Sequence, residues 1–310
     1  MSSTIVQETV YWRGAPRQVK AVKIDNQTYL LSGNLLRTAS VKNEWQDDVD
    51  DPEQTIRALK AVPTRIDILK FWQRIPETEA KFGYHKEWRE IAAIPISTFD
   101  HWWEKQISPK ARNKIRKARK LGVTFEQTEL SDDFVEGVVS IYNQSPVRRG
   151  KPFWHFGKDF ATVKSGLSRD LADSVFVAAR YEGELIGFIK FHVVDRYAMV
   201  TLILDKMAHR NKAPMNGMIA KVVEICAEQN LPYFTYTVWR RGEHGKFQES
   251  NGFRRIPVPE YFVPLTARGT FALQLGLHKG IKGAIPEPLM IRLLAWRAKW
   301  YSRKSSEDGE

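Results

Sequence analysis

The order of helix and strand signals predicts an α/β fold of the α+β kind, in which helices flank a mixed, mostly antiparallel sheet. Two observations support this prediction. Strand signals occur mainly as neighbouring hairpins, which pair antiparallel, and the later strands are separated by helices. The 310 residues include 43% hydrophobic and 27% charged residues, a composition that suffices for a folded core and excludes wholesale disorder.

Cap and turn residues mark the elements in the first part of the chain. Asp25 and Asn26 tolerate turn geometry between two extended runs, and Asp51 followed by Pro52 is typical of a capped helix start. The expected elements are a hairpin at 18–33, a helix at 51–62, a strand at 66–73, a short aromatic helix capped by Thr98, and a helix from Ser108 to Leu121.

From residue 123 onward the order of elements is regular. Glu182 and Gly183 join two apolar runs and predict a hairpin turn, and Ser131 is an expected helix cap. The expected order is a strand at 123–128, helices at 131–144 and 158–171, a hairpin at 174–195, a strand at 197–205, a helix at 214–229, a strand at 232–239, a short helix at 246–250 and a strand at 253–265.

The charge and cysteine content limit the classes of partner and site. A net charge of +12 favours an anionic partner, which is nucleic acid, a phospholipid headgroup or the phosphates of coenzyme A. Cys226 is the only cysteine, which excludes an internal disulfide and a cysteine-based zinc cluster. The N-terminal residues show no secretory pattern and no run is apolar enough to span a bilayer, so we expect a cytoplasmic protein with at most peripheral membrane contact.

Three local patterns resemble those of a known group of transferases. Lys110–Val123, KARNKIRKARKLGV, resembles the basic helix before the catalytic domain of FemAB-like proteins. Tyr181–Phe188, YEGELIGF, resembles the strand, turn and strand that this group shares with GNAT enzymes. Phe247–Phe253, FQESNGF, resembles the signature that precedes the last strand. With the order of elements, these patterns resemble the FemAB-like acyltransferases of the GNAT superfamily.

The resemblance implies a GNAT-like acyl-CoA N-acyltransferase fold for residues 108–266. Residues 1–107 are then an N-terminal α/β region and a candidate degenerate GNAT-like unit that precedes the unit at 108–266 in tandem. Residues 267–310 are a C-terminal helical extension. The implied activity is direct transfer of an acyl or aminoacyl group to an amine or peptide acceptor, which forms an amide bond. The donor is a thioester, acyl-CoA or acyl-carrier protein, or else an aminoacyl-tRNA. Acyl-CoA is a co-substrate, and no bound cofactor is expected.

Two departures from the family pattern bear on the donor. GNAT enzymes usually carry a glycine-rich loop before a helix, where backbone amides hold pyrophosphate. Here the loop is HRNKAPMNG, in which Pro214 lacks an amide hydrogen and Gly217 already lies inside the helix. Gln248 stands where the family usually has lysine, so the phosphate contact of that lysine is not transferred.

Polar and cationic side chains of this loop precede the N-terminus of the helix at 214–229, where the helix dipole favours an anion. The alternative is a solvated surface turn, with the first helical turn merely filled by an asparagine. The expected donor- and phosphate-binding residues are His209, Arg210, Asn211, Lys212 and Asn216.

Acyl transfer by direct attack needs a deprotonated amine and sometimes an acid for the leaving group. Asp205 ends a strand beside the gap where GNAT enzymes place the acyl group, and is a candidate base or orienting group; the alternative is a turn carboxylate. Tyr236 and His244 are the other catalytic candidates, His244 because imidazole titrates near neutrality. Cys226 recurs on an apolar helical stripe, which favours core packing. No residue spacing resembles a metal site, and none is expected.

Three segments are candidate partner sites. The basic helix at 108–121 suits tRNA, with a solvated face as the alternative. A loop of cations and aromatic residues is a candidate acceptor clamp or a cover for the core. A C-terminal helix after Pro288, with Trp296 and Trp300 on one face, packs on the protein or lies on an anionic membrane. The expected acceptor-binding residues are Arg148, Arg149, Lys151 and Trp154.

The alternative function comes from a different class. A degenerate, non-catalytic GNAT scaffold would bind RNA or an anionic membrane surface, and the altered phosphate loop favours it.

Overall fold

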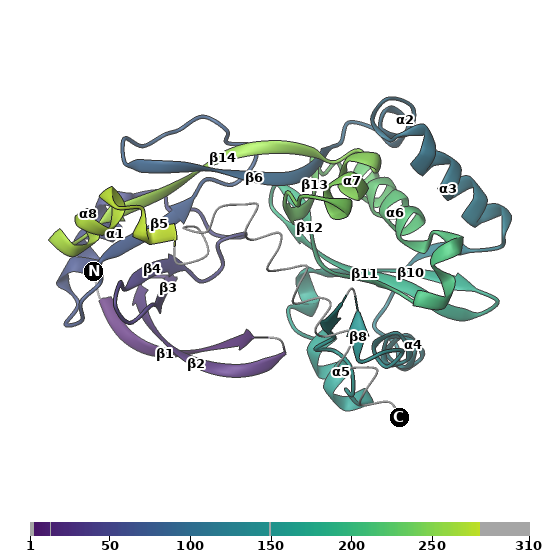
Figure 1. Cartoon of the computed structure of the whole chain (residues 1–310), viewed down its shortest axis with the longest axis horizontal. Helices are drawn as coiled ribbons and strands as arrows, with labels where there is room; N and C mark the ends of the chain where they lie inside the picture. Colours follow the sequence, from purple (N-terminus) through teal and green to yellow (C-terminus); the bar gives the residue numbers. More distant parts are fainter. Residues whose placement is uncertain (1–2, 13, 149, 280–310) are drawn as a thin grey trace. The chain divides into compact units, whose positions relative to one another are not determined.

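The computed structural model describes residues 3–12, 14–148 and 150–279. They form two compact units (Figure 1). Unit 1 contains the chain up to Arg89, Val147–Trp154 and the chain from Val258, and unit 2 contains Glu90–Pro146 and His155–Pro257. These divisions differ from the expected boundaries after residues 107 and 266. The physical reason is that two of the divisions fall inside the long strands at 85–95 and 254–264, and local sequence signals do not mark a boundary between units inside a strand.

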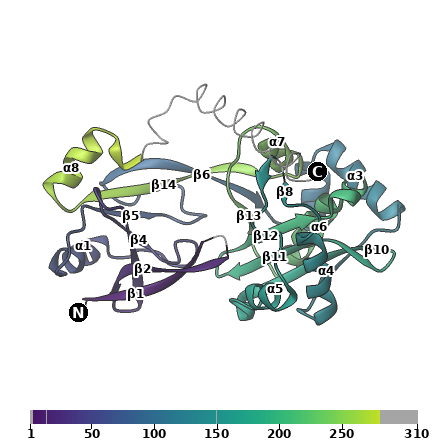
Figure 2. The same ribbon diagram turned by 60° about the horizontal axis from the view of Figure 1, so that its bottom comes forward.

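Unit 1 is built on a sheet with the strand order β1-β2-β3-β4-β5-β14-β6, in which β4 and β5 are parallel. Strands β1 and β2 form a long antiparallel hairpin (Figure 2). Its elements are β1 (Ser3–Trp12), β2 (Ala15–Ile24), β3 (Gln27–Ser32), β4 (Thr38–Val41), α1 (Pro52–Ala61), β5 (Ile68–Trp72), the first part of β6 (His85–Pro95), the short hairpin of β8 (Val147–Arg148) and β9 (Lys151–Pro152), the second part of β14 (Arg254–Pro264), α8 (Ala267–Gln274) and the 3₁₀ helix η4 (Leu277–Lys279).

Helix α1 connects the parallel strands β4 and β5 and closes the core of unit 1. Asp51 caps it, since its Oδ1 accepts a hydrogen bond from the backbone N of Gln54 at 2.9 Å. Leu59 of α1 is buried in one cluster with Tyr29 and Tyr261. Burial of these apolar surfaces stabilises the unit.

Unit 2 has the strand order β6-β13-β12-β11-β10-β7. Its elements are the second part of β6, α2 (Phe99–His101), the π-helical turn η1 (Trp102–Gln106), α3 (Pro109–Lys120), β7 (Thr124–Thr128), α4 (Asp132–Tyr142), α5 (Phe160–Leu167), the 3₁₀ helices η2 (Leu171–Asp173) and η3 (Met207–Lys212), β10 (Ser174–Tyr181), β11 (Glu184–Val194), β12 (Tyr197–Asp205), α6 (Pro214–Glu228), β13 (Tyr233–Val238), α7 (Glu243–Ser250) and the first part of β14.

Helices cover both faces of the unit 2 sheet, with α3 and α6 on one side and α4 and α5 on the other (Figure 1). Strand side chains alternate between faces, so Val177 packs with α3 and α6 while its neighbour Phe176 meets Phe134 of α4, with ring centroids 5.4 Å apart. Cys226 of α6 is fully buried in the core, and burial raises the pKa of its thiol to about 12. The expected packing role of Cys226 agrees with this position.

The two units share one topology. In unit 1 three antiparallel strands, β2, β3 and β4, lead through α1 to the parallel strand β5. In unit 2 the strands β10, β11 and β12 lead through α6 to the parallel strand β13. In each sheet one more strand pairs with the parallel strand. In unit 1 this strand is β14, which follows β13 in the sequence and pairs with β5. In unit 2 it is β6, which follows β5 in the sequence and pairs with β13. The predicted mostly antiparallel sheet flanked by helices is confirmed, and the repeated order fits two tandem GNAT-like units.

The remaining differences from the expected elements are local. The sequence analysis does not predict β1, β4 or β6, α8 lies in the expected helical extension, and α5 ends at Leu167 rather than at residue 171. Helix α7 begins at Glu243, three residues before the expected start. The C-terminal helix expected after Pro288 lies outside the described residues. Among the described helices, none combines the length and the apolar character that crossing a bilayer requires.

Candidate active site

The parallel strands of unit 2 separate after two residue pairs. Strands β12 and β13 pair only at Ala198 with Phe234 and at Met199 with Thr235, although β12 continues to Asp205. The pairing of β13 with β6 shifts register just beyond Thr235, and Thr237 has a φ of 56°. A left-handed backbone is unfavourable for a β-branched residue and costs about 1–3 kcal/mol. The strained bend of β13 therefore lies where β12 and β13 stop pairing, and we call the space between the two strands beyond this point the gap.

Thr235 lies at the point where the strands separate. Its side chain is fully buried, and among the described residues its Oγ1 has no hydrogen-bond partner. Buried hydroxyls without a partner are rare because desolvation costs about 1–3 kcal/mol. The sequence analysis misses Thr235, since nothing in the sequence distinguishes an unpartnered hydroxyl from a bonded one.

Asp205 ends β12 on the far side of the gap. Its side chain is buried, and its Oδ1 lies 3.4 Å from Nε of Arg210. The neighbouring Lys206 is also buried and forms an ion pair with Glu184. The carboxylate of Asp205 is therefore held by Arg210 of η3, the 3₁₀ helix that follows its strand.

The loop that is expected to bind phosphate is occupied by internal contacts. His209 Nε2 lies 3.1 Å from a carboxylate oxygen of Glu184. Lys212 Nζ lies 4.4 Å from the ring centroid of Tyr181 and 3.2 Å from His209 Nδ1. Asn211 is exposed. Together with the Arg210–Asp205 pair, these contacts engage three of the four residues within the chain, and two of them, His209 and Arg210, face a carboxylate.

The N-terminus of α6 presents few free amide donors. Ala213, with a φ of 55°, precedes Pro214, which has no amide hydrogen. A Cβ on Gly217 would lie 2.0 Å from the ring of Phe125, so this glycine allows close packing of α6 on β7. Asn216 is buried, and its Nδ2 donates to Oδ1 of Asn251 at 2.9 Å. The structure lacks the backbone cradle of a glycine-rich pyrophosphate loop, in line with the sequence departure.

Tyr236 and His244 come together beside the gap. Their ring centroids are 5.5 Å apart, and both side chains are half-buried. Gln248 is fully buried, and its Oε1 accepts a hydrogen bond from the backbone N of Arg240 at 2.9 Å. The side chain at the family's lysine position thus holds the loop after β13 rather than reaching solvent.

The predicted acceptor residues belong to unit 1 by their contacts. Arg148 lies over the ring of Phe153, with 4.9 Å between its Cζ and the ring centroid. Lys151 is exposed on β9, and Trp154 is 44% exposed. Arg149 lies outside the described residues. The other predicted site residues all belong to unit 2, so the acceptor assignment stays a prediction.

Helix α3 carries the basic surface of unit 2, which we define as its seven cationic side chains. Six of them are exposed, and in the described part of the chain none forms an ion pair with a carboxylate. Arg112 and Arg116 lie over the ring of Trp103, at 5.8 Å and 5.6 Å from its centroid. The basic surface consists of Lys110, Arg112, Lys114, Arg116, Lys117, Arg119 and Lys120.

A pocket of about 310 Å³ lies beside the start of this helix. Gln106, at the end of η1, lines it, and the backbone N of Ser108 donates to Ser250 O of α7 at 3.0 Å, which fixes α3 against α7. The guanidinium of Arg255 lies 4.8 Å from the ring centroid of Trp239. The pocket therefore combines an aromatic ring, cations and an amide. The other lining residues are Glu249, Gly252, Phe253 and Arg254.

No family model and no curated relative matches the chain. Solved structures do match it. L-PGS from Bacillus licheniformis superposes with a TM-score of 0.55 at 14% identity, over 90% of each chain. The C-terminal domain (DUF2156) of a candidate lysylphosphatidylglycerol synthetase from Agrobacterium fabrum gives 0.53 at 15%, over 86% of this chain and 87% of that one. FemX gives 0.52 at 11%, over 84% and 88%. The chain shares the fold of these proteins, which agrees with the GNAT/FemAB-like fold that the motifs predict.

Proposed function

We propose that the chain is an N-acyltransferase that transfers an aminoacyl group from aminoacyl-tRNA to an amine acceptor. The amine attacks the ester carbonyl directly, the ester bond to the terminal ribose breaks, and an amide forms. The proton of the amine passes to a base, and the ribose oxygen receives a proton as it leaves. No covalent intermediate with the protein forms, and the buried Cys226 takes no part.

The distribution of positive charge is the observation that carries this proposal. His209 and Arg210 lie against Glu184 and Asp205, and Lys212 lies over the ring of Tyr181, whereas the cations of α3 form no ion pair with a carboxylate in the described chain. Exposed, uncompensated cations on one helix bind a phosphate backbone and release its counterions. A coenzyme A donor would need phosphate contacts at α6, where backbone donors are few.

The pocket beside α3 supports a nucleic-acid donor rather than a small thioester. Single-stranded nucleotides bind by stacking on aromatic rings and guanidinium planes. Trp239 and Arg255 supply both, and Arg254 adds an exposed cation. The single-stranded end of a tRNA has the chemistry that this pocket would recognise.

The gap between β12 and β13 supplies groups for the chemical step. Asp205 would orient the attacking amine and accept its proton. The hydroxyl of Thr235 would donate a hydrogen bond to the carbonyl oxygen as negative charge develops. Tyr236 and His244 would protonate the leaving ribose oxygen. One solved structure of the same fold is named for a lysylphosphatidylglycerol synthetase, which is consistent with aminoacyl transfer.

The donor is tested by direct competition. The full chain is incubated with an amine panel and either tRNA charged with labelled amino acids or labelled acyl-CoA. We expect label to reach the amine only from the charged tRNA, with the transfer abolished by ribonuclease treatment of the donor. Transfer that requires acyl-CoA and survives ribonuclease would contradict the proposal.

A second candidate is a non-catalytic scaffold that binds RNA through the same helix. The closed N-terminus of α6 favours it, because a degenerate enzyme loses its donor cradle first. It predicts tRNA binding that is equally tight for charged and uncharged tRNA and no transfer to any amine. Single-turnover measurements with saturating protein decide between the two, since the enzyme must deplete charged tRNA faster when an amine is present.

A further inference from the structure

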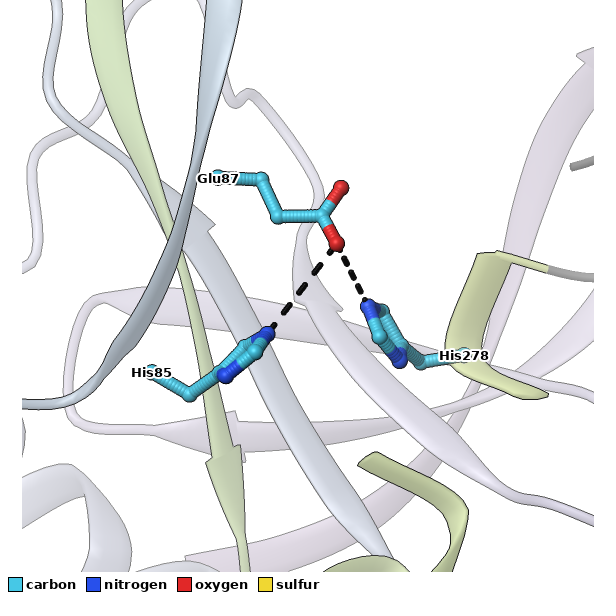
Figure 3. A group of neighbouring side chains, drawn as sticks. All are labelled: His85, Glu87 and His278. Atoms are coloured by element: carbon cyan, nitrogen blue, oxygen red, sulfur yellow. Dashed lines mark hydrogen bonds and ion pairs between the residues drawn. The ribbon is translucent and has the colours of Figure 1, made fainter. Parts of the chain in front are cut away.

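Three side chains in unit 1 converge on one point. His85 and Glu87 lie two residues apart on β6, and strand geometry places such residues on the same face. His278 comes from η4, far away in the sequence. Figure 3 shows a nitrogen of each imidazole directed at the same carboxylate oxygen of Glu87. The sequence analysis finds no zinc-like spacing because the third group lies so far along the chain.

The distances suit a small divalent cation. His278 Nε2 lies 2.8 Å and His85 Nε2 lies 4.0 Å from Oε1 of Glu87. One potential ligand atom from each residue lies within 4.8 Å of the other two. Ligand atoms at about 2.0–2.1 Å from a tetrahedral zinc ion are separated by about 3.4 Å. The observed separations of 2.8 Å and 4.0 Å fall on either side of that value, so side-chain shifts of under about 1 Å complete the site.

The surroundings fix one imidazole and leave another accessible. The side chain of His278 is 3% exposed and its ring centroid lies 4.8 Å from that of Phe262. His278 Nδ1 is buried and has no hydrogen-bond partner among the described residues. The side chain of His85 is 45% exposed. A metal ion would therefore sit at the surface edge of unit 1, with room for water as a further ligand.

Lys279 would compete with a metal ion for the carboxylate of Glu87. Its Nζ lies 2.9 Å from Oε1 of Glu87, and its side chain is half exposed. The ammonium neutralises the carboxylate in the absence of a metal ion. A bound cation would take over this role and push Lys279 into solvent.

We propose that His85, Glu87 and His278 form a binding site for a divalent transition-metal ion of the zinc class. Two imidazole nitrogens and one carboxylate oxygen are a ligand set that zinc accepts together with water. Calcium and magnesium prefer oxygen ligands throughout and do not fit this set. The ion would tie η4 to β6 and so stabilise unit 1. The proposal is independent of acyl transfer.

The test uses the untagged full chain after treatment with EDTA and dialysis. Titration with zinc chloride in a calorimeter should give one bound ion per chain. His85→Gln and Glu87→Gln should weaken binding by at least about 10-fold. His101→Gln is the matched control, because His101 is an exposed histidine of unit 2 and should leave binding unchanged. Zinc should raise the thermal midpoint of the parent chain but not of His85→Gln.

The variant His85→Gln and one further variant, Lys279→Met, keep the proposal open to refutation. His85 is half exposed, so His85→Gln should fold even if a change at the buried His278 does not. Lys279→Met removes the competing cation and should tighten zinc binding. Absence of zinc binding, or equal binding by the parent chain and His85→Gln, would overturn the proposal. An affinity that falls in Lys279→Met would also oppose it.

Discussion

Replacing Thr235 by valine tests whether the hydroxyl at the separation of β12 and β13 serves a substrate rather than the fold. Valine keeps the shape of threonine and removes only the polar group. Because Thr235 is fully buried and its Oγ1 lacks a partner among the described residues, the folded chain bears the desolvation cost of that hydroxyl. The free energy of unfolding should therefore rise by about 1–3 kcal/mol in the valine variant.

Catalysis should change in the opposite direction. Removing one donor to a developing oxyanion typically costs about 10²–10³ in rate. We expect aminoacyl transfer by Thr235→Val to fall by at least about 10-fold, while Thr235→Ser, which retains the hydroxyl, keeps most of the rate. Stability is measured by urea unfolding followed through tryptophan fluorescence, and transfer by single-turnover kinetics with labelled aminoacyl-tRNA.

Two results would refute this reasoning. A valine variant that is less stable by 1 kcal/mol or more (about a fivefold change in the unfolding constant) would show that the hydroxyl has a partner in the folded chain. A valine variant that gains stability and keeps full transfer activity would show that the hydroxyl serves no substrate. Only higher stability combined with slower transfer supports the proposed role.

Three other outcomes follow from the contacts of unit 2. Lys114→Ala with Lys117→Ala should weaken tRNA binding and reduce the slope of log affinity against log salt by about 1 for each lysine in contact with phosphate, as filter binding at several salt concentrations would measure. Asn216→Ala should lower the free energy of unfolding in urea by about 1–3 kcal/mol, because it leaves a buried amide oxygen unpaired. The hydrogen bond from Lys206 lowers the pKa of Glu184 below its ordinary value. The contribution of Glu184 to the free energy of unfolding is therefore present above pH 4.5 and is lost as the pH falls through the lowered pKa. In urea unfolding, Glu184→Gln should cost at most about 1 kcal/mol at pH 7 and nothing at strongly acidic pH.

Elements that depend on local chemistry could be predicted from the sequence. Asp51, Thr98, Ser108 and Ser131 each cap the helix expected of them, with a side-chain oxygen that accepts a backbone hydrogen bond. A cap acts within three residues, so its signal is complete in the local sequence. The hairpin at Glu182 is predictable for the same reason.

Pairing between strands far apart in the sequence could not be predicted. Strand β6, which the sequence analysis misses, pairs with β13, with Ala93 opposite Thr235, and β14, which is expected as a strand, pairs with the distant β5. No local sequence pattern indicates which distant strand will pair. Strand β6 also changes along its length from alternating exposure to a buried run, so it lacks a single strand pattern. The sequence shows no internal repeat, so the repeated topology of the two units could be expected only from the resemblance to a family with tandem units.

In the candidate site, too, local features could be predicted from the sequence, whereas contacts between distant residues could not. Asp205 could be predicted at the end of β12 because a strand end is a local feature. The basic residues at 209–212 could be listed from the sequence, but the contacts of His209 with Glu184 and of Arg210 with Asp205 depend on the fold. The buried hydroxyl of Thr235 and the pairing of Trp239 with Arg255 likewise exist only in three dimensions.

The location of uncompensated charge carries more functional information than the net charge itself. A net charge of +12 favours an anionic partner, and the sequence offers two basic segments for it. At residues 209–212, an incoming phosphate would have to compete with carboxylates that already lie within 3.4 Å of two of the basic side chains. At α3 it would displace only mobile counterions, whose release favours binding. The contacts of the two segments therefore favour α3 as the anion-binding surface, and its seven cations along 12 residues support the proposed polyanionic donor over a single pyrophosphate.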